Sequence, residues 1–301
     1  MTCSRGAVMF QTFSRSLELA KASLSVLRSD KELLVFPLIS FIALVVVTIS
    51  FAVPLWLTGA VADAVDGKIN IPGAILAFLF YLVSYTVTFF FNTALVGAAM
   101  IRLDGGDPTL RDGFRIAMSR LPQIIAYALI AATVGMILRW ISERAGFVGQ
   151  IVAGIVGFGW SVATFLVVPI LVLENVGPVD AIKRSASLLR KTWGEQLVGN
   201  FGIGLIFGLL ALVALVIGVA LIVAIAQVST ILAGVAVVVT ALIVGAIALV
   251  GAAASGIFTA SLYRYATKGD PGPAFRTETI SAAFRPGDGA PAGVATFGGP
   301  R

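Results

Sequence analysis

The chain is organised around the stretch from Leu173 to Gln196, which reads LENVGPVDAIKRSASLLRKTWGEQ and joins two long apolar runs. Four apolar residues in it recur at the spacing of one helix face: Val179, Ile182, Ala186 and Leu189. Acidic and basic residues fill the rest of that helix surface. This pattern predicts an amphipathic helix that lies flat on a membrane.

Capping signals separate such amphipathic segments from the apolar runs that follow them. Thr192 stands three residues before Glu195, and Ser29 stands three residues before Glu32. At this spacing a hydroxyl and a carboxylate can each satisfy a free backbone N–H at a helix start. We therefore expect a membrane-spanning helix to begin at each of these two pairs.

Two further amphipathic helices are predicted nearer the N-terminus. Residues 10–28 carry apolar positions at helical spacing, with charged residues among the others. A second such helix follows Asp107, which can cap a helix whose first residue is Pro108, because proline has no N–H to leave unpaired. Its apolar face is expected to contain Leu110, Phe114, Ala117, Met118 and Leu121.

Composition identifies the broad class. Of 301 residues 58% are hydrophobic and only 12% charged, and the mean hydropathy is +1.01, so lipid has to cover much of the apolar surface. There is no histidine, which excludes histidine-based catalytic triads and histidine-ligated zinc or haem. Cys3 is the single cysteine and cannot form an internal disulfide. The sequence gives no reason to expect a cofactor or a metal.

The apolar runs predict six membrane-spanning helices. Runs without Asp, Glu, Lys or Arg cover residues 33–62, 71–101, 121–138 and 147–173. A longer uncharged stretch, 196–263, is divided by polar residues at 227–230 and is expected to form two more helices. The predicted fold is an all-α, polytopic membrane bundle of six transmembrane helices with three amphipathic helices on its cytoplasmic side.

The predicted organisation repeats a unit of one amphipathic helix and one membrane hairpin. A flexible segment 1–9 precedes the membrane domain 10–263, whose units are 10–101, 108–173 and 178–263. Asp104 and Pro108 stand 70 residues before Glu174 and Pro178, which aligns the second unit with the third. Duplication and the shared demands of a membrane hairpin are both open explanations. A glycine- and proline-rich tail, 264–301, is expected to be disordered.

The basic residues predict the orientation. Of 21 Lys and Arg, 18 lie in the N-terminal segment, in the connections 102–120 and 183–191, or from residue 264 onward. Positive residues are retained in the cytoplasm, so both termini and all three amphipathic helices are expected inside the cytoplasmic membrane. Because these residues lie between apolar runs and not on one compact face, the net charge of +6 does not indicate a nucleic-acid partner.

Polar residues within the runs are few and uncharged. A charge at the bilayer centre costs roughly 2.5–3.5 kcal/mol on insertion scales, and its absence argues against a proton-coupled carrier or an intramembrane aspartyl protease. Asn92 and Asn200 are interpreted as helix-packing residues, with path lining as the alternative. The small-residue pairs Gly204–Gly208 and Gly251–Ser255 are candidates for close helix packing, within one chain or in a homo-oligomer.

Four surface cations are the candidate lipid contacts: Arg111, Arg115, Lys183 and Arg184. They either anchor the helices at the interface or bind anionic lipid headgroups, each basic residue near such a surface being worth on the order of 1 kcal/mol. Glu174 is expected to pair with Lys183 or Arg184. Asp104 and Asp107 are two carboxylates without further ligands and do not indicate a metal site.

Two segments carry a resemblance to known proteins: LDGGDPTLRDGF at 103–114 and the quoted stretch at 173–196. They resemble an uncharacterised family of bacterial and archaeal six-span membrane proteins. They are also distantly similar to the membrane portion attached to some glycerophosphodiester phosphodiesterases. This resemblance implies a shared membrane fold. The phosphodiesterase barrel and its histidines are absent from this sequence, so the enzymatic activity is not implied.

The expected function is non-catalytic: interaction with membrane lipids, organisation of the envelope, or support of a membrane-protein partner. The alternative is a transporter or channel for a small uncharged or lipid-like solute. That alternative requires a continuous polar path, for which the candidate residues are Asn92, Asn200, Ser161 and Thr164.

Overall fold

The computed structural model describes residues 17–59, 62–63, 71–144, 146–193 and 202–282, and every regular element in these ranges is helical. Residues 17–29 form the first described helix. The others are η1 (Lys31–Leu34), α2 (Val35–Leu57), α4 (Ile71–Leu103), α5 (Leu110–Ser119), α6 (Leu121–Arg144), α7 (Gly146–Ala163), α8 (Val167–Leu173), α9 (Pro178–Trp193), α10 (Gly202–Ala226), α11 (Thr230–Lys268) and α12 (Thr277–Ala282). The predicted all-α class is confirmed.

Within the described ranges, six helical segments are long and apolar enough to cross a membrane. They are η1 with α2, α4, α6, α7 with α8, α10, and α11. The expected number of spans is therefore confirmed, and the chain is a multi-pass membrane protein. The break between the last two spans lies at Gln227–Ser229, within the predicted polar cluster, and Ser229 caps α11 by accepting the Leu232 N–H.

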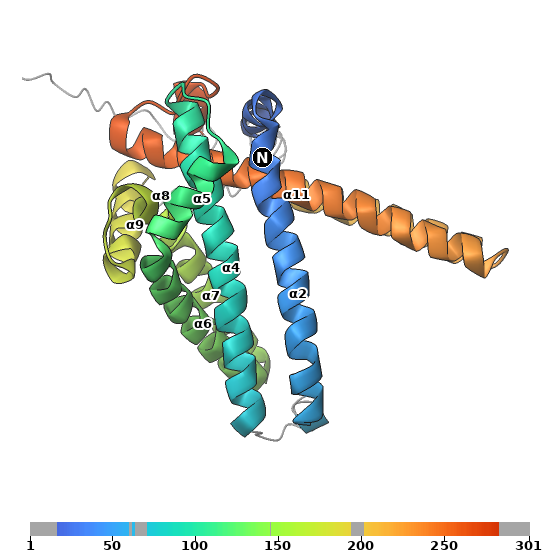
Figure 1. The fold of residues 1–301 in the computed structure, drawn as a ribbon. Coiled ribbons are helices and arrows are strands. Elements are labelled where there is room, and N and C mark those ends of the chain that lie inside the picture. Colours follow the sequence, from blue (N-terminus) through green and yellow to red (C-terminus); the bar gives the residue numbers. More distant parts are fainter. Residues whose placement is uncertain (1–16, 60–61, 64–70, 145, 194–201, 283–301) are drawn as a thin grey trace, which may run out of the picture.

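Figure 1 shows how the spans are arranged. Helices α2 and α4 lie side by side, and α6 and α7 form a second pair against α4. Helix 17–29, α5, α9 and α12 lie toward the end opposite the α2–α4 connection. The hairpin of α10 and α11 leaves this bundle at a steep angle (Figure 1), and the apolar side chains of its outer half, such as Val216 and Leu242, are exposed.

The core lies where α4 meets the short helices. Every residue of α4 from Thr93 to Met100 is buried. Around this stretch pack fully buried side chains from the other elements: Phe36, Leu166, Ile170, Leu189, Ile257 and Leu262. Beyond this core the spans expose apolar side chains, which is the surface that lipid covers in a membrane.

The second predicted surface helix differs from its prediction in its start. Helix α5 begins at Leu110, and its N-cap is Thr109, which forms a capping box with Asp112. Asp107 is not the cap; it is exposed and pairs with Arg102 at 3.4 Å. The capping box satisfies two backbone N–H groups at once, which a single aspartate cannot do. Met118, a residue of the predicted apolar face, is 58% exposed.

Helix α9 buries one face against the rest of the protein, and this face differs from the predicted apolar stripe. Ala181, Ser185 and Leu188 are buried together with Leu189. Two residues of the predicted apolar stripe, Val179 and Ala186, are exposed. The reason is Ser185, whose buried hydroxyl accepts the Leu166 N–H at 3.0 Å and therefore faces inward despite being polar.

That hydrogen bond marks a break that the sequence did not predict. The expected single run 147–173 is divided into α7 and α8 by a turn at Thr164–Leu166. Leu166 is the N-cap residue of α8 and has no capping bond from its own side chain. Because its N–H has no helical partner, the hydroxyl of Ser185 supplies the acceptor that a free N–H at a helix start needs.

The predicted cap of the first span is also corrected. Asp30, not Ser29, is the N-cap, and its carboxylate accepts the Glu32 N–H at 3.2 Å. The Ser29 hydroxyl instead donates to the Ser25 carbonyl at 3.0 Å. The Glu32 carboxylate accepts the Leu110 N–H at 3.0 Å, so it ties the start of α5 to the start of the first span. The predicted pair Thr192–Glu195 reaches beyond the described residues.

The first part of the predicted tail is folded. Helix α11 continues past Tyr263 to Lys268 and ends at Gly269, whose φ of 73° is the left-handed conformation typical of a helix end. Residues 270–282 then turn back and end in α12 (Figure 1). Phe275 and Ile280 are 6% and 0% exposed, so two apolar anchors hold this segment against the bundle. Residues 1–9 and 283–301 lie outside the described ranges.

Two different glycine contacts hold α10 against α11. A Cβ at Gly251 would lie 2.7 Å from the Phe207 Cβ, and one at Gly218 would lie 2.2 Å from Thr240 Cγ2. The predicted pair Gly204–Gly208 is not used in this way, because nothing lies within 4 Å of a Cβ at either position. The helix pair thus packs through Gly251 as predicted, but not through Gly204 and Gly208.

Candidate functional site

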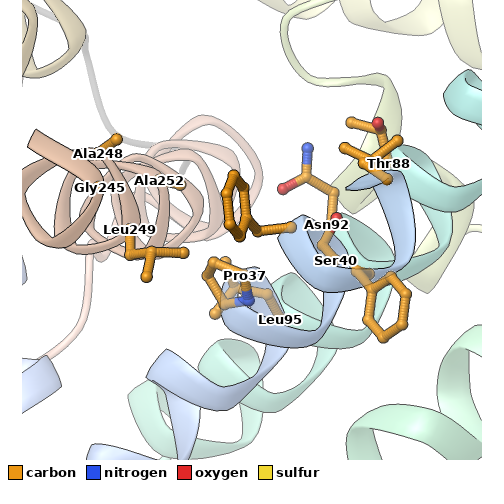
Figure 2. Close-up of a pocket in the computed structure, with 12 residues that line it drawn as sticks. Pro37, Ser40, Thr88, Asn92, Leu95, Gly245, Ala248, Leu249 and Ala252 are labelled. Carbon is orange, nitrogen blue, oxygen red and sulfur yellow. The ribbon is translucent and has the colours of Figure 1, made fainter. Parts of the chain in front are cut away.

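A pocket of about 320 Å³ lies between α2, α4 and α11, near the place where α11 leaves the bundle (Figure 2). Its lining is mainly apolar: Pro37, Phe41, Leu44, Phe91, Leu95, Gly245, Ala248, Leu249 and Ala252. Three polar side chains complete it: Ser40 from α2, and Thr88 and Asn92 from α4. Mainly apolar walls with a few polar groups are typical of small-molecule sites.

Asn92 is the polar centre of this pocket. Figure 2 shows its amide extending from α4 into the space between α4 and α11. Within the described part of the chain no hydrogen-bond partner is found for this amide, whereas the Thr88 hydroxyl donates to the Ser84 carbonyl at 2.8 Å. An amide held in an apolar medium without a partner costs roughly 2–7 kcal/mol. The amide is therefore exposed in the pocket and does not serve the interhelical packing that its sequence position indicated.

The other candidate path residues do not join Asn92. Ser161 and Thr164 lie at the end of α7, and neither lines the pocket. The Ser161 hydroxyl donates to Gly157 O at 2.9 Å, and the Thr164 hydroxyl donates to Trp160 O at 2.8 Å. Both therefore bond within their own helix. Asn200 lies outside the described residues.

The four predicted cations lie on two helices and are mostly paired. Arg115 of α5 contacts Asp112 at 2.5 Å, and the hydrogen bond from Thr109 holds the pKa of Asp112 below its usual value. Arg184 of α9 lies 3.3 Å from Glu174, as predicted for that acid, and Lys183 lies 3.9 Å from Asp180. Arg111 is the exception, since no described carboxylate forms an ion pair with it.

Further exposed cations on the same side were not singled out from the sequence. Arg190 and Lys191 end α9, and both are exposed without an ion-pair partner in the described ranges. Lys21 and Arg28 on helix 17–29 are likewise exposed and have no ion-pair partner in the described ranges. The distribution of Lys and Arg in the sequence contains this signal, but it does not show which of these cations pair with nearby acids, as Arg115 does with Asp112.

An ionic cluster at the C-terminal end of α11 was not predicted from the sequence. The Arg264 side chain, only 12% exposed, donates to Leu103 O at 2.7 Å and to Asp270 Oδ2 at 2.7 Å, and it also contacts Asp104. Lys268 adds a contact to Asp104 at 3.6 Å. The bond from Arg264 holds the pKa of Asp270 below its usual value. Arg264 therefore joins the end of α11 to the turn before α5.

Tyr263, the residue before Arg264, contacts Glu174, the acid that aligns with Asp104 in the other unit. The Tyr263 hydroxyl donates to Glu174 Oε1 at 2.8 Å, and Glu174 is also bound by Arg184. Glu174 stands 70 residues after Asp104, so the two acids that align between the units hold consecutive residues of α11. We call Tyr263, Arg264, Asp104 and Glu174 the α11 anchor. The alignment of the two acids was the signal that pointed to it.

Comparison with known proteins identifies a family but no activity. The profile of a family of unknown function (DUF6159) matches residues 71–274. No curated protein and no solved structure matches the chain. The expected likeness to the membrane portion of glycerophosphodiester phosphodiesterases therefore finds no support. Among the described residues, no group of three or more Cys, Asp or Glu side chains is placed to hold a metal ion.

Proposed function

We propose, for a chain that belongs to a family of unknown function (DUF6159), a non-catalytic role in which the protein binds anionic lipid headgroups of the cytoplasmic membrane. The site is the cationic face made by Arg111, Arg190 and Lys191, on α5 and α9. In this proposal both termini and the amphipathic helices lie in the cytoplasm, as the distribution of Lys and Arg favours.

One observation carries the proposal. Helices α5 and α9 bury one face against the spans, through Gly113 and Ala117 in α5 and through Leu188 and Leu189 in α9. Their opposite faces carry exposed cations that have no carboxylate partner in the described ranges. A cation without a partner at the membrane interface is available to a phosphate group, whereas Arg115 and Arg184 already neutralise acids of the protein.

The proposal is tested by lipid retention. The full chain is purified from vesicles that contain equal amounts of phosphatidylglycerol and phosphatidylethanolamine, and the retained lipids are quantified. We expect enrichment of phosphatidylglycerol. The triple variant R111Q/R190Q/K191Q should lose this enrichment several-fold, since each basic residue contributes on the order of 1 kcal/mol. The paired residues should matter less, so R115Q/R184Q is expected to lose clearly less.

A matched control removes charge from the other end of the spans. Arg144 lies at the end of α6, with its guanidinium 5.3 Å from the Trp140 ring centre, and R144Q should leave the enrichment unchanged. Wild-type protein without a preference for phosphatidylglycerol would refute the proposal, as would a triple variant that behaves like the wild type. Recovery of a stoichiometric protein in place of lipid would favour the scaffolding form of this role, with a membrane protein or a second copy as the partner.

Transport of a small uncharged solute remains the alternative proposal, and it has less support. A path through the membrane needs polar groups in sequence across the bundle. Ser161 and Thr164 bond within α7 and lie apart from the pocket at Asn92, and α4 is buried without interruption from Thr93 to Met100. Uptake of a neutral solute into vesicles that contain the protein would favour this alternative.

A further inference from the structure

We propose that the pocket between α2, α4 and α11 binds one uncharged lipid-like molecule, whose carbonyl or hydroxyl group pairs with the amide of Asn92. This site is distinct from the cationic face, and its ligand differs in charge, so either proposal can fail without the other. The argument rests on the depth of Asn92, on its unpaired amide and on the shape of the pocket.

The depth of Asn92 places the pocket inside the hydrocarbon. Asn92 precedes Arg102 on α4 by ten residues, which is about 15 Å at about 1.5 Å per residue. Ser40 follows Lys31 by nine residues on the antiparallel first span, so it reaches a similar depth. The hydrocarbon core is about 30 Å thick, so both polar groups lie near its middle. A charged headgroup does not reach this depth, and no Asp, Glu, Lys or Arg is among the residues that line the pocket.

The amide of Asn92 needs a partner that the described part of the protein does not provide. Water is scarce in the hydrocarbon core, and a lipid chain offers neither a donor nor an acceptor. An amide can both donate and accept, so a carbonyl, an ester or a hydroxyl on the ligand satisfies it equally well. The Ser40 hydroxyl lies in the same pocket and offers a second contact (Figure 2).

The size and walls of the pocket fit an apolar chain or ring. Its volume of about 320 Å³ lies at the lower end of the range of small-molecule pockets, roughly 300–1,000 Å³. The α11 wall is made of small residues such as Gly245, Ala248 and Ala252 (Figure 2). Nothing lies within 4 Å of a Cβ built on Gly245, so this wall leaves room for a ligand. A neutral lipid such as a diacylglycerol meets these requirements, because it has apolar chains, ester carbonyls and a hydroxyl group but no charge.

Photo-crosslinking tests the assignment. The full chain in lipid nanodiscs is exposed to a photoactivatable diacylglycerol and, separately, to a phosphatidylglycerol that carries the same photoactivatable chain. We expect the diacylglycerol to label peptides of α2, α4 and α11 at the pocket at least fivefold more strongly than the phosphatidylglycerol does. Asn92→Leu, which removes the amide, should lower this labelling at least fivefold.

Two further variants separate loss of the site from loss of the fold. Gly245→Leu places a side chain in the pocket from a position where a Cβ meets no atom within 4 Å, and it should abolish labelling while the protein keeps its thermal stability. Ser50→Ala removes an exposed hydroxyl on α2 outside the pocket and should leave labelling unchanged. Equal labelling by the two probes, or undiminished labelling in both Asn92→Leu and Gly245→Leu, would overturn the proposal. Loss of phosphatidylglycerol enrichment in R111Q/R190Q/K191Q has no bearing on it.

Discussion

At the scale of single residues, Gly113 shows how closely the short helices approach the spans. A Cβ at this position would lie 2.4 Å from the Phe36 ring and 2.9 Å from the Ala94 carbonyl oxygen. Helix α5 therefore packs against α4 at a distance that only glycine permits, and the Phe36 ring of α2 contacts the same position. We predict that Gly113→Ala lowers the free energy of unfolding by about 1–3 kcal/mol, because the backbone of α4 cannot move away easily.

Thermal unfolding in detergent micelles measures this effect, and Gly154 supplies the control. Nothing lies within 4 Å of a Cβ at Gly154 in α7. Gly154→Ala should therefore stabilise the protein slightly, by about 0.5–1 kcal/mol, because alanine favours a helix more than glycine does. A Gly113→Ala protein as stable as Gly154→Ala would show that α5 does not pack as described.

Asp30 gives a prediction about pH. Burial raises the pKa of its carboxyl, and the bond from the Glu32 N–H opposes this with a smaller effect. The folded chain thus holds the proton more tightly than the unfolded chain, so ionisation of Asp30 lowers stability once the pH exceeds the ordinary carboxyl value. Asp30→Asn keeps an acceptor for the cap and removes the buried charge.

We expect Asp30→Asn to raise the melting temperature in detergent at pH 7 and to have little effect near pH 2.5, well below the ordinary carboxyl value of 3.8, where the carboxyl is protonated in both states. Asp180→Asn is the control, since that acid is exposed on α9. A gain of the same size at both pH values would mean that the substitution acts through the helix cap and not through the charge.

Residue pairs differ in how far the sequence predicts them. Arg139 and Glu143 are four residues apart on one helix, a spacing that favours an ion pair, and they lie 2.6 Å apart. Glu174 and Arg184 are also close in sequence, and that pair is confirmed. The bond from Leu110 to Glu32 joins residues 78 positions apart, so no local spacing indicates it. The pocket at Asn92 likewise depends on three helices whose neighbours the sequence does not specify.

At the scale of the elements, the α11 anchor fixes the C-terminal end of the last span. Arg264→Leu removes the bonds to Leu103 O, Asp104 and Asp270 together. Because hydrogen bonds to charged groups contribute about 1.5–3 kcal/mol, we predict a loss of about 2–4 kcal/mol in the free energy of unfolding. Arg264→Lys keeps the charge but not the fork of donors, and should recover only part of this loss.

Thermal unfolding again provides the measurement. The control is Arg28→Leu, which removes an exposed arginine that has no ion-pair partner among the described residues. It should change stability by less than about 0.5 kcal/mol. If Arg264→Leu proved as mild as Arg28→Leu, the anchor would not hold α11.

The anchor also predicts acid sensitivity. Arg264 lowers the pKa of Asp270, so the ionised acid contributes stability above its ordinary value of 3.8, and this contribution is lost as the pH falls below that value. Wild-type protein should therefore lose stability between pH 4 and pH 2 more steeply than Asp270→Asn, as followed by thermal unfolding. Parallel pH profiles for the two proteins would contradict this prediction.

The ends of helices were predictable only where the sequence offers a single candidate capping residue. The cap at Ser229 and the end of α11 at Gly269 follow from single residues of the expected type. Around residue 30 and around residue 108, several polar residues compete for the same N–H groups, and the structure uses Asp30 and Thr109. The turn between α7 and α8 depends on Ser185, which lies on the next helix and gives no signal within the run.

At the scale of the whole molecule, the orientation is the main prediction. Single cysteines are placed in a Cys3→Ser background and labelled on intact cells with a maleimide that does not cross membranes. Asp66→Cys and Ser142→Cys, in connections with few basic residues, should be labelled from outside. Ser187→Cys and Arg276→Cys should react only after the cells are permeabilised. Labelling of Arg276→Cys on intact cells would reverse the proposed topology.

The number of spans was predictable because hydropathy and charge are properties of short segments. The direction of the α10–α11 hairpin was not, since its residues carry no charge and present a similar apolar surface on every side. Its packing is decided by a few contacts at one end, such as Gly256 against Leu95, where a Cβ would lie 2.5 Å from the leucine side chain. Such contacts between distant segments leave no periodic pattern in the sequence.

The α11 anchor has a consequence for the order of biosynthesis. Asp104 and Glu174 leave the ribosome long before Tyr263 and Arg264 are translated, so the earlier hairpins enter the bilayer before either acid can bind α11. A nascent chain that ends before residue 263 can insert its earlier helices but cannot form the α11 anchor. We therefore expect assembly to be completed only after translation of the final span, and ribosome-released fragments without it to be degraded.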